Sequence, residues 1–244
     1  QHFLQLADID LGGDRWIDIG NINDSAAYFV ASPAFKGVYD GGGHVVRNLT
    51  LPSGTDTAAA GLFARVSGTV ERLGTENVTR IAGSLTGNGM LRYCYALSGA
   101  LAGDQADGSH IESCFVSPDA NITPERFASG EVCYQLNGSK SDDVVWHQTI
   151  GTDNLPTLDE SHGVVYCHDI FDKKVYTNSA TPKYEVHTKE ELLAISNKVG
   201  DICLMNDRDL GEWKADRHYQ IKGNFDGGGH TISYSGKDAF TGLF

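Results

Sequence analysis

The chain lacks the residue patterns that several protein classes need. Of its 244 residues only 19 are Lys or Arg, against 32 Asp or Glu, so the formal net charge is −13. An acidic chain without a basic cluster binds nucleic acid poorly, and we expect no nucleic-acid partner. No apolar run approaches the roughly 18 residues of a spanning helix, so we expect no membrane span in this segment.

Cysteine is also scarce, and its spacing excludes the common zinc motifs. The five cysteines are odd in number and none stands in a Cys-x-x-Cys pair. We expect buried, reduced thiols, because a chain this long can build a core without disulfides. Neither a Ser/His/Asp nucleophile signature nor a phosphate-cradling loop occurs. The sequence therefore predicts no metal site, no cofactor and no catalytic residue.

Proline is rare and glycine is abundant, with 6 and 29 residues respectively. This balance favours many short strands joined by tight turns over long helices or disorder. The chain opens on an amphipathic run at Gln1 and shows no signal peptide. We therefore expect a mature or truncated chain, and export stays open.

One sequence pattern occurs twice. Residues 37–44 read GVYDGGGH and residues 223–230 read GNFDGGGH. Three consecutive glycines predict a tight turn, since glycine adopts positive φ and lets backbones approach closely. A turn repeated in a repeated unit predicts a modular architecture. The predicted structural turns comprise Asp40, Gly41, Gly42, Gly43 and His44, and Asp226, Gly227, Gly228, Gly229 and His230.

The Asp and His of each turn admit two interpretations. Asp40 with His44, and Asp226 with His230, would suit a metal site or an acid-base pair. We favour a structural role, in which the carboxylate accepts hydrogen bonds from turn amides and the imidazole packs on the corner. A catalytic pair has no need to be duplicated in every module.

Two Asp-x-Asp pairs lie upstream of the glycine turns. They are Asp8 with Asp10, and Asp207 with Asp209. Calcium takes six to eight oxygen ligands, and two alternating carboxylates supply too few. We therefore expect no calcium site at either pair.

A finer repeat follows the first glycine turn. Small-Leu-x-small corners at residues 61–64, 84–87 and 100–103 each precede a polar turn and a strand-like run. Within these runs the equivalent positions, about 20 residues apart, are Leu73, Cys94 and Cys114. That spacing is typical of the rungs of a solenoid, in which equivalent residues stack about 4.8 Å apart.

The glycine turns together with the Gly-Leu-x-Gly-like corners resemble those of GLUG-motif repeat proteins, which occur in bacterial surface and adhesin-like proteins. The resemblance covers about residues 1–116 and 202–244, and departs from the motif at Ala64, Ser84 and Ala100. It implies a mainly β fold: a right-handed parallel β-helix-like solenoid with short helical and hairpin additions. It also implies an extracellular location at the cell surface, and it carries over no catalytic residue.

The pattern divides the chain into four segments. We expect a GLUG-type β-solenoid over residues 1–122, a helix-and-strand cap closing its last rung over 123–160, a β-hairpin and linker over 161–184, and a helix with the truncated start of a second repeat over 185–244. In the cap, residues 124–137 predict a short helix broken near Ser129-Gly130, and residues 144–150 predict a strand. Thr188 and Glu191 predict a capping box for a helix over residues 188–199.

Exposed aromatic side chains are the candidate binding groups, because aromatic faces bind sugars and protein partners. The candidates are Tyr28 and Phe29 in an inserted loop, Trp146 in the cap, and Tyr166, Phe171 and Tyr176 in the hairpin. Arg47, Arg72 and Arg92, with Glu71 and Glu112 nearby, predict an outward charged ladder. We interpret this ladder as a solvated face of local ion pairs.

Together with the resemblance to GLUG-motif proteins, these patterns predict a non-enzymatic repeat segment of an exported bacterial cell-surface protein that serves adhesion or ligand display. The expected partner is a host or microbial glycan or a surface protein. One alternative is a carbohydrate-active β-helix enzyme, a polysaccharide lyase or glycoside hydrolase, which would need convergent carboxylates on one face. A second alternative is a purely structural spacer.

Overall fold

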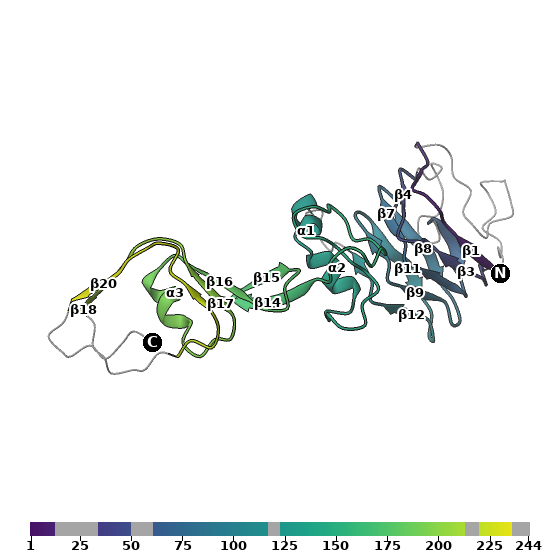
Figure 1. Ribbon diagram of the computed structural model, residues 1–244. Helices are drawn as coiled ribbons and strands as arrows, with labels where there is room; N and C mark the ends of the chain where they lie inside the picture. Colours follow the sequence, from purple (N-terminus) through teal and green to yellow (C-terminus); the bar gives the residue numbers. More distant parts are fainter. Residues whose placement is uncertain (13–33, 50–60, 117–122, 213–219, 236–244) are drawn as a thin grey trace. The chain divides into compact units, whose positions relative to one another are not determined.

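The computed structural model describes residues 1–12, 34–49, 61–116, 123–212 and 220–235 (Figure 1). The chain forms two compact units, unit 1 over residues 1–165 and unit 2 over residues 166–244. The predicted solenoid and its cap therefore belong to one unit, and the predicted hairpin belongs with the second repeat. Tyr28 and Phe29 lie outside the described residues.

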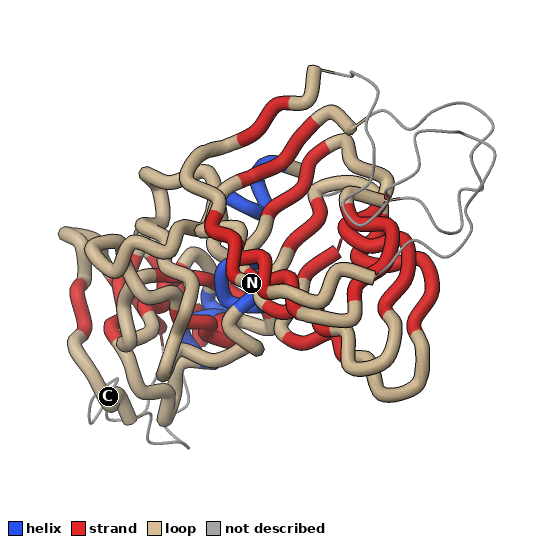
Figure 2. Tube along the Cα trace, turned by 90° about the vertical axis from the view of Figure 1, so that its right-hand side faces the viewer, coloured by secondary structure: helices blue, strands red, loops and turns tan. Residues whose placement is uncertain are grey.

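Unit 1 is a parallel β-solenoid, as predicted, and its strands form three sheet faces (Figures 1 and 2). Face A contains β1 (His2–Leu4), β3 (Val38–Asp40), β6 (Thr69–Glu71), β9 (Met90–Arg92) and β12 (His110–Glu112). Face B contains β2 (Ile9–Asp10), β4 (Val45–Arg47), β7 (Gly74–Glu76), β10 (Tyr95–Ala96) and β13 (Phe115–Val116). Face C contains β5 (Phe63–Val66), β8 (Arg80–Leu85) and β11 (Ala100–Gln105). Neighbours in each face come from consecutive turns of the coil, here called rungs.

The corner between faces A and B depends on left-handed backbone. Arg72, Tyr93 and Ser113 have φ values of 52°, 54° and 47° and follow β6, β9 and β12 directly. Each run that the sequence predicts as one strand is therefore two strands, with a bend between them. The first rung is likewise divided, into β1 and β2, with a bend between them.

The triple-glycine turn is a longer version of this corner. Asp40 pairs with Glu71 on face A, and Val45 pairs with Gly74 on face B. The corner therefore contains four residues, 41–44, whereas the equivalent corner of the next rung contains two, 72 and 73. Gly42 and Gly43 have φ values of 60° and 79°. A Cβ on Gly41 would lie 2.6 Å from the carbonyl oxygen of Arg72 in the next rung. The turn therefore needs glycine for both its conformation and its close approach.

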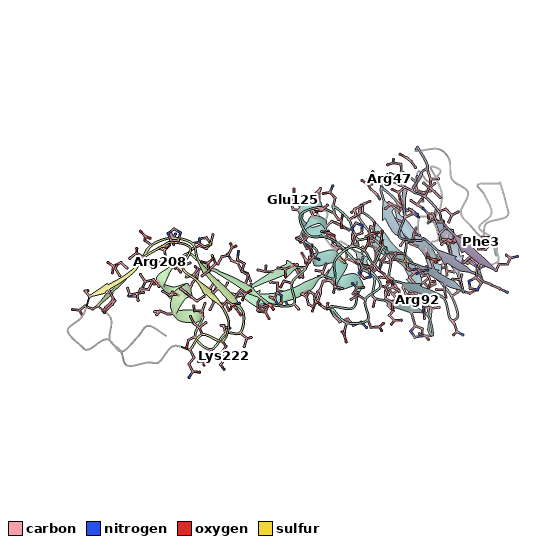
Figure 3. All side chains as sticks on the ribbon, viewed as in Figure 1. Phe3, Arg47, Arg92, Glu125, Arg208 and Lys222 are labelled. Atoms are coloured by element: carbon pink, nitrogen blue, oxygen red, sulfur yellow. The ribbon has the colours of Figure 1, made fainter. Side chains whose placement is uncertain are left out.

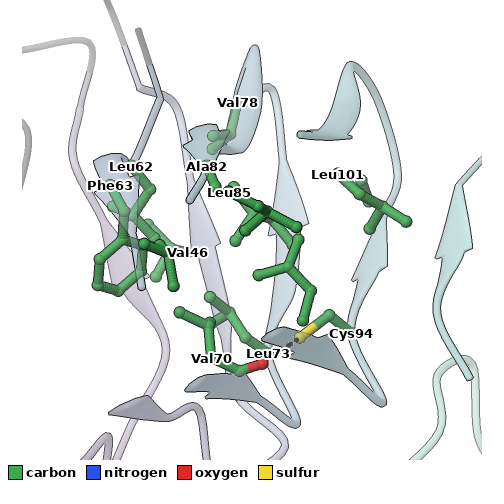
Figure 4. Close-up of a cluster of buried hydrophobic side chains, with 14 of the residues drawn as sticks. Val46, Leu62, Phe63, Val70, Leu73, Val78, Ala82, Leu85, Cys94 and Leu101 are labelled. Carbon is green, nitrogen blue, oxygen red and sulfur yellow. Dashed lines mark hydrogen bonds between the residues drawn. The ribbon is translucent and has the colours of Figure 1, made fainter. Parts of the chain in front are cut away.

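The predicted column of Leu73, Cys94 and Cys114 is confirmed. Tyr95 N–H donates to the Leu73 carbonyl at 2.9 Å, and Phe115 N–H donates to the Cys94 carbonyl at 2.9 Å, which stacks the three residues in successive rungs. Leu73 and Cys94 are fully buried in the solenoid core (Figure 4). Cys114 is partly buried and packs against the same core.

The predicted small-Leu-x-small corners are wrong in two respects. Phe63 and Ala102 both pair with Ala82, so residues 61–64 and 100–103 align with 80–83 and not with 84–87. These segments also lie mostly in the strands of face C. The buried residues Leu62, Ile81 and Leu101 occupy the shared position. The sequence pattern points to residues 84–87 and not to 80–83, because Arg80 and Ile81 occupy the positions at which the other two segments have a small residue and Leu.

The cap is built on two short helices, α1 (Pro124–Ala128) and α2 (Glu131–Leu136). The predicted break is confirmed at Gly130, which has a φ of 88°. Residues 144–150 do not form the predicted strand. They contain one bridge, from His147 to Thr157. Asn137 instead binds this segment, accepting from Trp146 N–H at 2.9 Å and donating to the Trp146 carbonyl at 2.8 Å.

The cap covers the outward side of face B. Tyr95 of β10 packs on Phe127 and Trp146 of the cap, with ring centroids 5.6 and 5.9 Å apart. Phe115 of β13 also lies 6.3 Å from Phe127. The cap therefore contacts the last rung at Phe115 and also covers Tyr95 of the rung before, burying large aromatic side chains of face B.

Unit 2 has its own core. The hairpin is formed by β14 (Tyr166–Ile170) and β15 (Lys173–Thr177), as predicted. Two parallel sheets follow: β16 (Lys183–Val186), β17 (Asp201–Leu204) and β19 (Phe225–Asp226), then β18 (Arg208–Glu212) and β20 (Ile232–Ser235). The core residues include Tyr184, Val186, Leu192, Ile195, Ile202, Leu204 and Leu210. The strand β16 was not predicted.

The helix of unit 2 is shorter than predicted. The capping box of Thr188 and Glu191 is confirmed, and α3 (Lys189–Ala194) buries Leu192. The helix ends early because Asn197 is left-handed, with a φ of 65°. Val199 leaves the helical path, is 62% exposed and bridges Lys222.

Candidate ligand-binding site

A column of polar side chains follows one corner of unit 1, where the chain leaves face B. Asn48 and Asn77 have φ values of 61° and 52°, a conformation that Asn tolerates better than most residues. Asn77 Nδ2 donates to Asn48 Oδ1 at 3.1 Å, and Asn48 Nδ2 donates to Asp10 Oδ1 at 2.9 Å. Asn77 N–H donates to the Ser98 hydroxyl at 2.8 Å. Hydrogen bonding across four rungs therefore holds these polar groups in place.

This polar column has an electrostatic consequence at its first member. Asp10 accepts from Asn48 and from Gly12 N–H, and these hydrogen bonds lower the pKa of its carboxyl. Asp10 is therefore ionised at neutral pH and anchors the column as an acceptor.

A pocket of about 330 Å³ lies where this column meets the cap. Its solenoid side is lined by Glu76, Asn77, Leu97 and Ser98, and its cap side by Pro124, Phe127, Asn154 and Leu155. The lining thus combines apolar surface with a carboxylate, two amides and a hydroxyl. The volume is near the lower end of the roughly 300–1,000 Å³ of small-molecule sites.

Glu76 gives the pocket its charge. Arg47 Nε lies 3.2 Å from Glu76 Oε2, and Arg47 also contacts Asp8 at 3.2 Å on the preceding rung. The carboxylate is therefore partly neutralised and held in position. Among the described lining residues, Glu76 is the one acidic group. The pocket can accept and donate hydrogen bonds, and it does not present a pair of carboxylates.

The predicted charged ladder is rearranged. Arg92 on face A contacts Glu71 at 2.5 Å, and Arg72 at the left-handed corner contacts Asp40. Arg47 lies on face B, opposite Glu76, so it does not belong to the same column as Arg92 (Figure 3). The three arginines are not equivalent, because Arg72 stands one position later in its rung than Arg92 does. The interpretation as local ion pairs between rungs holds for all three arginines, since Arg47 pairs with Asp8 and Glu76 of the neighbouring rungs.

The predicted turn role of the repeated Asp is confirmed in both units. Asp40 accepts from Gly42 N–H at 2.9 Å, and Asp226 accepts from Gly228 N–H at 2.9 Å.

The repeated His contacts an aspartate in the preceding rung. His44 lies 3.4 Å from Asp8, and His230 lies 3.4 Å from Asp207. The same aspartates accept from Val45 N–H at 3.0 Å and from Thr231 N–H at 2.9 Å. Within the described ranges, no group of three or more His, Cys, Asp or Glu could hold a metal ion.

None of the described aromatic candidates lines the pocket. The prediction that Trp146 is an exposed binding group is wrong, because its side chain is fully buried against Tyr95. Phe171 packs on Tyr184 in the core of unit 2, with ring centroids 5.8 Å apart. The prediction that Phe171 is an exposed binding group is therefore also wrong.

Tyr166 and Tyr176 are half-buried in the hairpin. Tyr166 stacks on His168 with an interplanar angle of 5°. Tyr176 is opposite Cys167, so the two tyrosines lie on opposite sides of the hairpin. They therefore cannot form one aromatic surface.

The comparisons with known proteins do not place the chain. A scan of protein-family models, a search of curated proteins and a search of solved structures each gave no match. A β-solenoid alone indicates neither adhesion nor catalysis, since one fold hosts many functions. The site is therefore interpreted from its own geometry.

Proposed function

We propose that unit 1 is a non-catalytic ligand-display module, and that its pocket binds one saccharide residue of a glycan. The supporting observation is the pocket between the polar column and the cap, with apolar surface beside fixed amide, hydroxyl and carboxylate groups. A pyranose ring needs this combination, because its faces are apolar and its rim carries hydroxyls. The two sides of the pocket come from elements that pack tightly together, so the site is preformed.

The parent setting that we propose is an exported bacterial cell-surface protein of the GLUG-motif type, used for adhesion or display. The glycine-turn and corner motifs of the sequence support it. None of the described helices is long and apolar enough to cross a membrane.

The alternative of a polysaccharide-cleaving enzyme receives less support from this geometry. Glycoside hydrolysis uses two carboxyl groups across the scissile bond, and a lyase needs a base near the sugar C5 proton. The described pocket offers Glu76 alone, and that carboxylate faces Arg47. A purely structural spacer would leave the pocket without a ligand.

A glycan array followed by calorimetric titration of each hit tests the proposal. Asn154 is exposed at the cap side of the pocket, so Asn154→Trp should fill it and weaken binding at least tenfold. Ser161→Trp places the same side chain at an exposed position of unit 1 just after the cap, outside the lining, and should bind like wild type. A wild-type chain that binds no glycan would favour the structural spacer. If Asn154→Trp binds as tightly as wild type, the glycan binds at a site other than this pocket.

Turnover assays on the bound polysaccharides separate the enzyme alternative. The proposal expects binding without release of reducing ends or unsaturated products. If the wild-type chain cleaves a polysaccharide, and Glu76→Gln binds it without cleaving it, unit 1 is an enzyme and the display proposal is wrong.

A further inference from the structure

Cys94 and Cys114 occupy the same position in consecutive rungs. Each follows a left-handed corner residue, Tyr93 or Ser113, and each precedes a strand of face B. The flanking pairs Arg92 with Glu112 and Tyr95 with Phe115 are in register. In-register residues of neighbouring parallel strands are about 4.8 Å apart, which lies within the roughly 4.4–6.8 Å between Cα atoms that a disulfide spans.

The two sulfur atoms have different surroundings. Cys94 is fully buried, whereas Cys114 is partly accessible. Cys94 N–H donates to Cys114 Sγ at 3.4 Å. Hydrogen bonding from Cys94 lowers the pKa of Cys114, while burial raises the pKa of Cys94. Cys114 is therefore the thiol that ionises more readily and that a small reagent can reach.

No other described cysteine has this arrangement. Cys133 is buried in the cap, where burial raises its pKa to about 12. Cys167 and Cys203 are in unit 2, on the hairpin and on β17. All five cysteines are free thiols in this structure.

We propose that Cys94 and Cys114 are a redox-active pair that a low-molecular-weight disulfide converts into a covalent link between two rungs. The Cys114 thiolate attacks the small disulfide, forms a mixed disulfide and releases one small thiolate. The Cys94 thiol then loses its proton and attacks the Cys114 sulfur, and the second small thiolate leaves. Two protein thiols are oxidised and one small disulfide is reduced, so the electrons balance.

The link would close a loop of one complete turn of the coil. It would restrict the unfolded chain and hold neighbouring rungs together when the solenoid frays. Oxidising compartments outside the cytosol supply suitable disulfides. The proposal does not depend on the pocket or on the glycan.

The test is incubation of the folded chain with graded ratios of oxidised to reduced glutathione, followed by thiol blocking and peptide mass spectrometry. We expect a Cys94–Cys114 linked peptide that lacks two hydrogens, and a melting temperature of unit 1 that rises by several degrees. Free Cys94 and Cys114 in fully oxidised glutathione would overturn the proposal, and so would linkage through other cysteines.

Two variants test the order of the steps. Cys94→Ser should stop at the mixed disulfide, with one glutathione retained on Cys114. Cys114→Ser should retain no glutathione at Cys94, because the Cys94 sulfur is inaccessible to it. The opposite pattern would overturn the assigned roles. If either variant fails to fold, the linked wild-type peptide and its melting shift still decide whether the pair forms.

Discussion

Asp40 and Arg72 join two consecutive rungs at the triple-glycine corner. Arg72 Nε donates to Asp40 Oδ1 at 2.9 Å, and the same oxygen accepts from Gly42 N–H. The Asp40 side chain is 16% exposed and that of Arg72 is 35% exposed. One carboxylate therefore fixes both the local turn and its contact with the following rung.

A double-mutant cycle measures this coupling. Asp40→Asn and Arg72→Asn keep residues that tolerate their local backbone, and we expect a coupling free energy of about 0.5–2 kcal/mol in urea unfolding. The cycle of Lys140→Gln and Asp143→Asn is the control, because that surface pair is 3.7 Å apart with Asp143 99% exposed. Its coupling should be indistinguishable from zero. Equal coupling in both cycles would contradict the structural role of Asp40.

The repeated turns provide a matched pair of glycines. A Cβ on Gly41 would lie 2.6 Å from Leu73 Cα, whereas a Cβ on Gly227, the equivalent residue of unit 2, would meet no described residue within 4 Å. We expect Gly41→Ala to destabilise unit 1 by about 1–3 kcal/mol through overpacking. Gly227→Ala should change the stability of unit 2 by less than about 0.5 kcal/mol. Thermal unfolding of each variant checks this, and comparable losses would show that the turns differ from this description.

Acid should weaken the cap through Asp153. Burial by itself raises the pKa of Asp153, but hydrogen bonds from Thr149 N–H at 2.5 Å and from His162 at 2.6 Å outweigh it and hold the pKa below 3.8. A depressed folded pKa contributes stability that is present above pH 3.8 and is lost as pH falls through the folded value. Hydrogen-exchange protection of residues 144–155, corrected for the intrinsic rate, should therefore fall below pH 4.

The variant Asp153→Asn isolates this effect. Its protection should change less between pH 5 and pH 3 than that of wild type, in which each unit of pKa depression corresponds to about a tenfold change. Asp142→Asn, in an exposed cap loop, is the control and should retain the wild-type profile. A wild-type profile in Asp153→Asn would assign the acid sensitivity to other carboxyls.

Calcium should have no effect on folding. Asp8 and Asp10 already accept hydrogen bonds from Val45 N–H, Gly12 N–H and Asn48, which competes with metal coordination. We expect no heat in calorimetric titration with Ca²⁺ and no rise in melting temperature. A saturable heat that Asp8→Asn abolishes would reveal a calcium site.

The core of the fold was predictable because a solenoid repeats its inward residues. Leu73 and Cys94 are about 20 residues apart, and stacking alone requires that spacing. The corners were not predictable in the same way. Arg72 and Tyr93 adopt positive φ although neither residue type favours it, because the surrounding strands determine where the chain must bend.

The candidate site could not be predicted from the sequence. Asn77 and Asn154 are far apart along the chain and line one pocket only because Tyr95 docks the cap onto face B. Trp146 was a reasonable surface candidate by residue type, but the same docking buries it. The one available signal was Asn at positions 48 and 77, a residue type enriched in left-handed corners.

The triple-glycine corner shows that bend length and strand alignment are independent in this coil. Two additional residues are accommodated between β3 and β4, yet both strands keep their register with β6 and β7. Peptide grafts at the outer bends should therefore leave the interior undisturbed, which makes the scaffold suited to length variation and to engineered display of foreign loops.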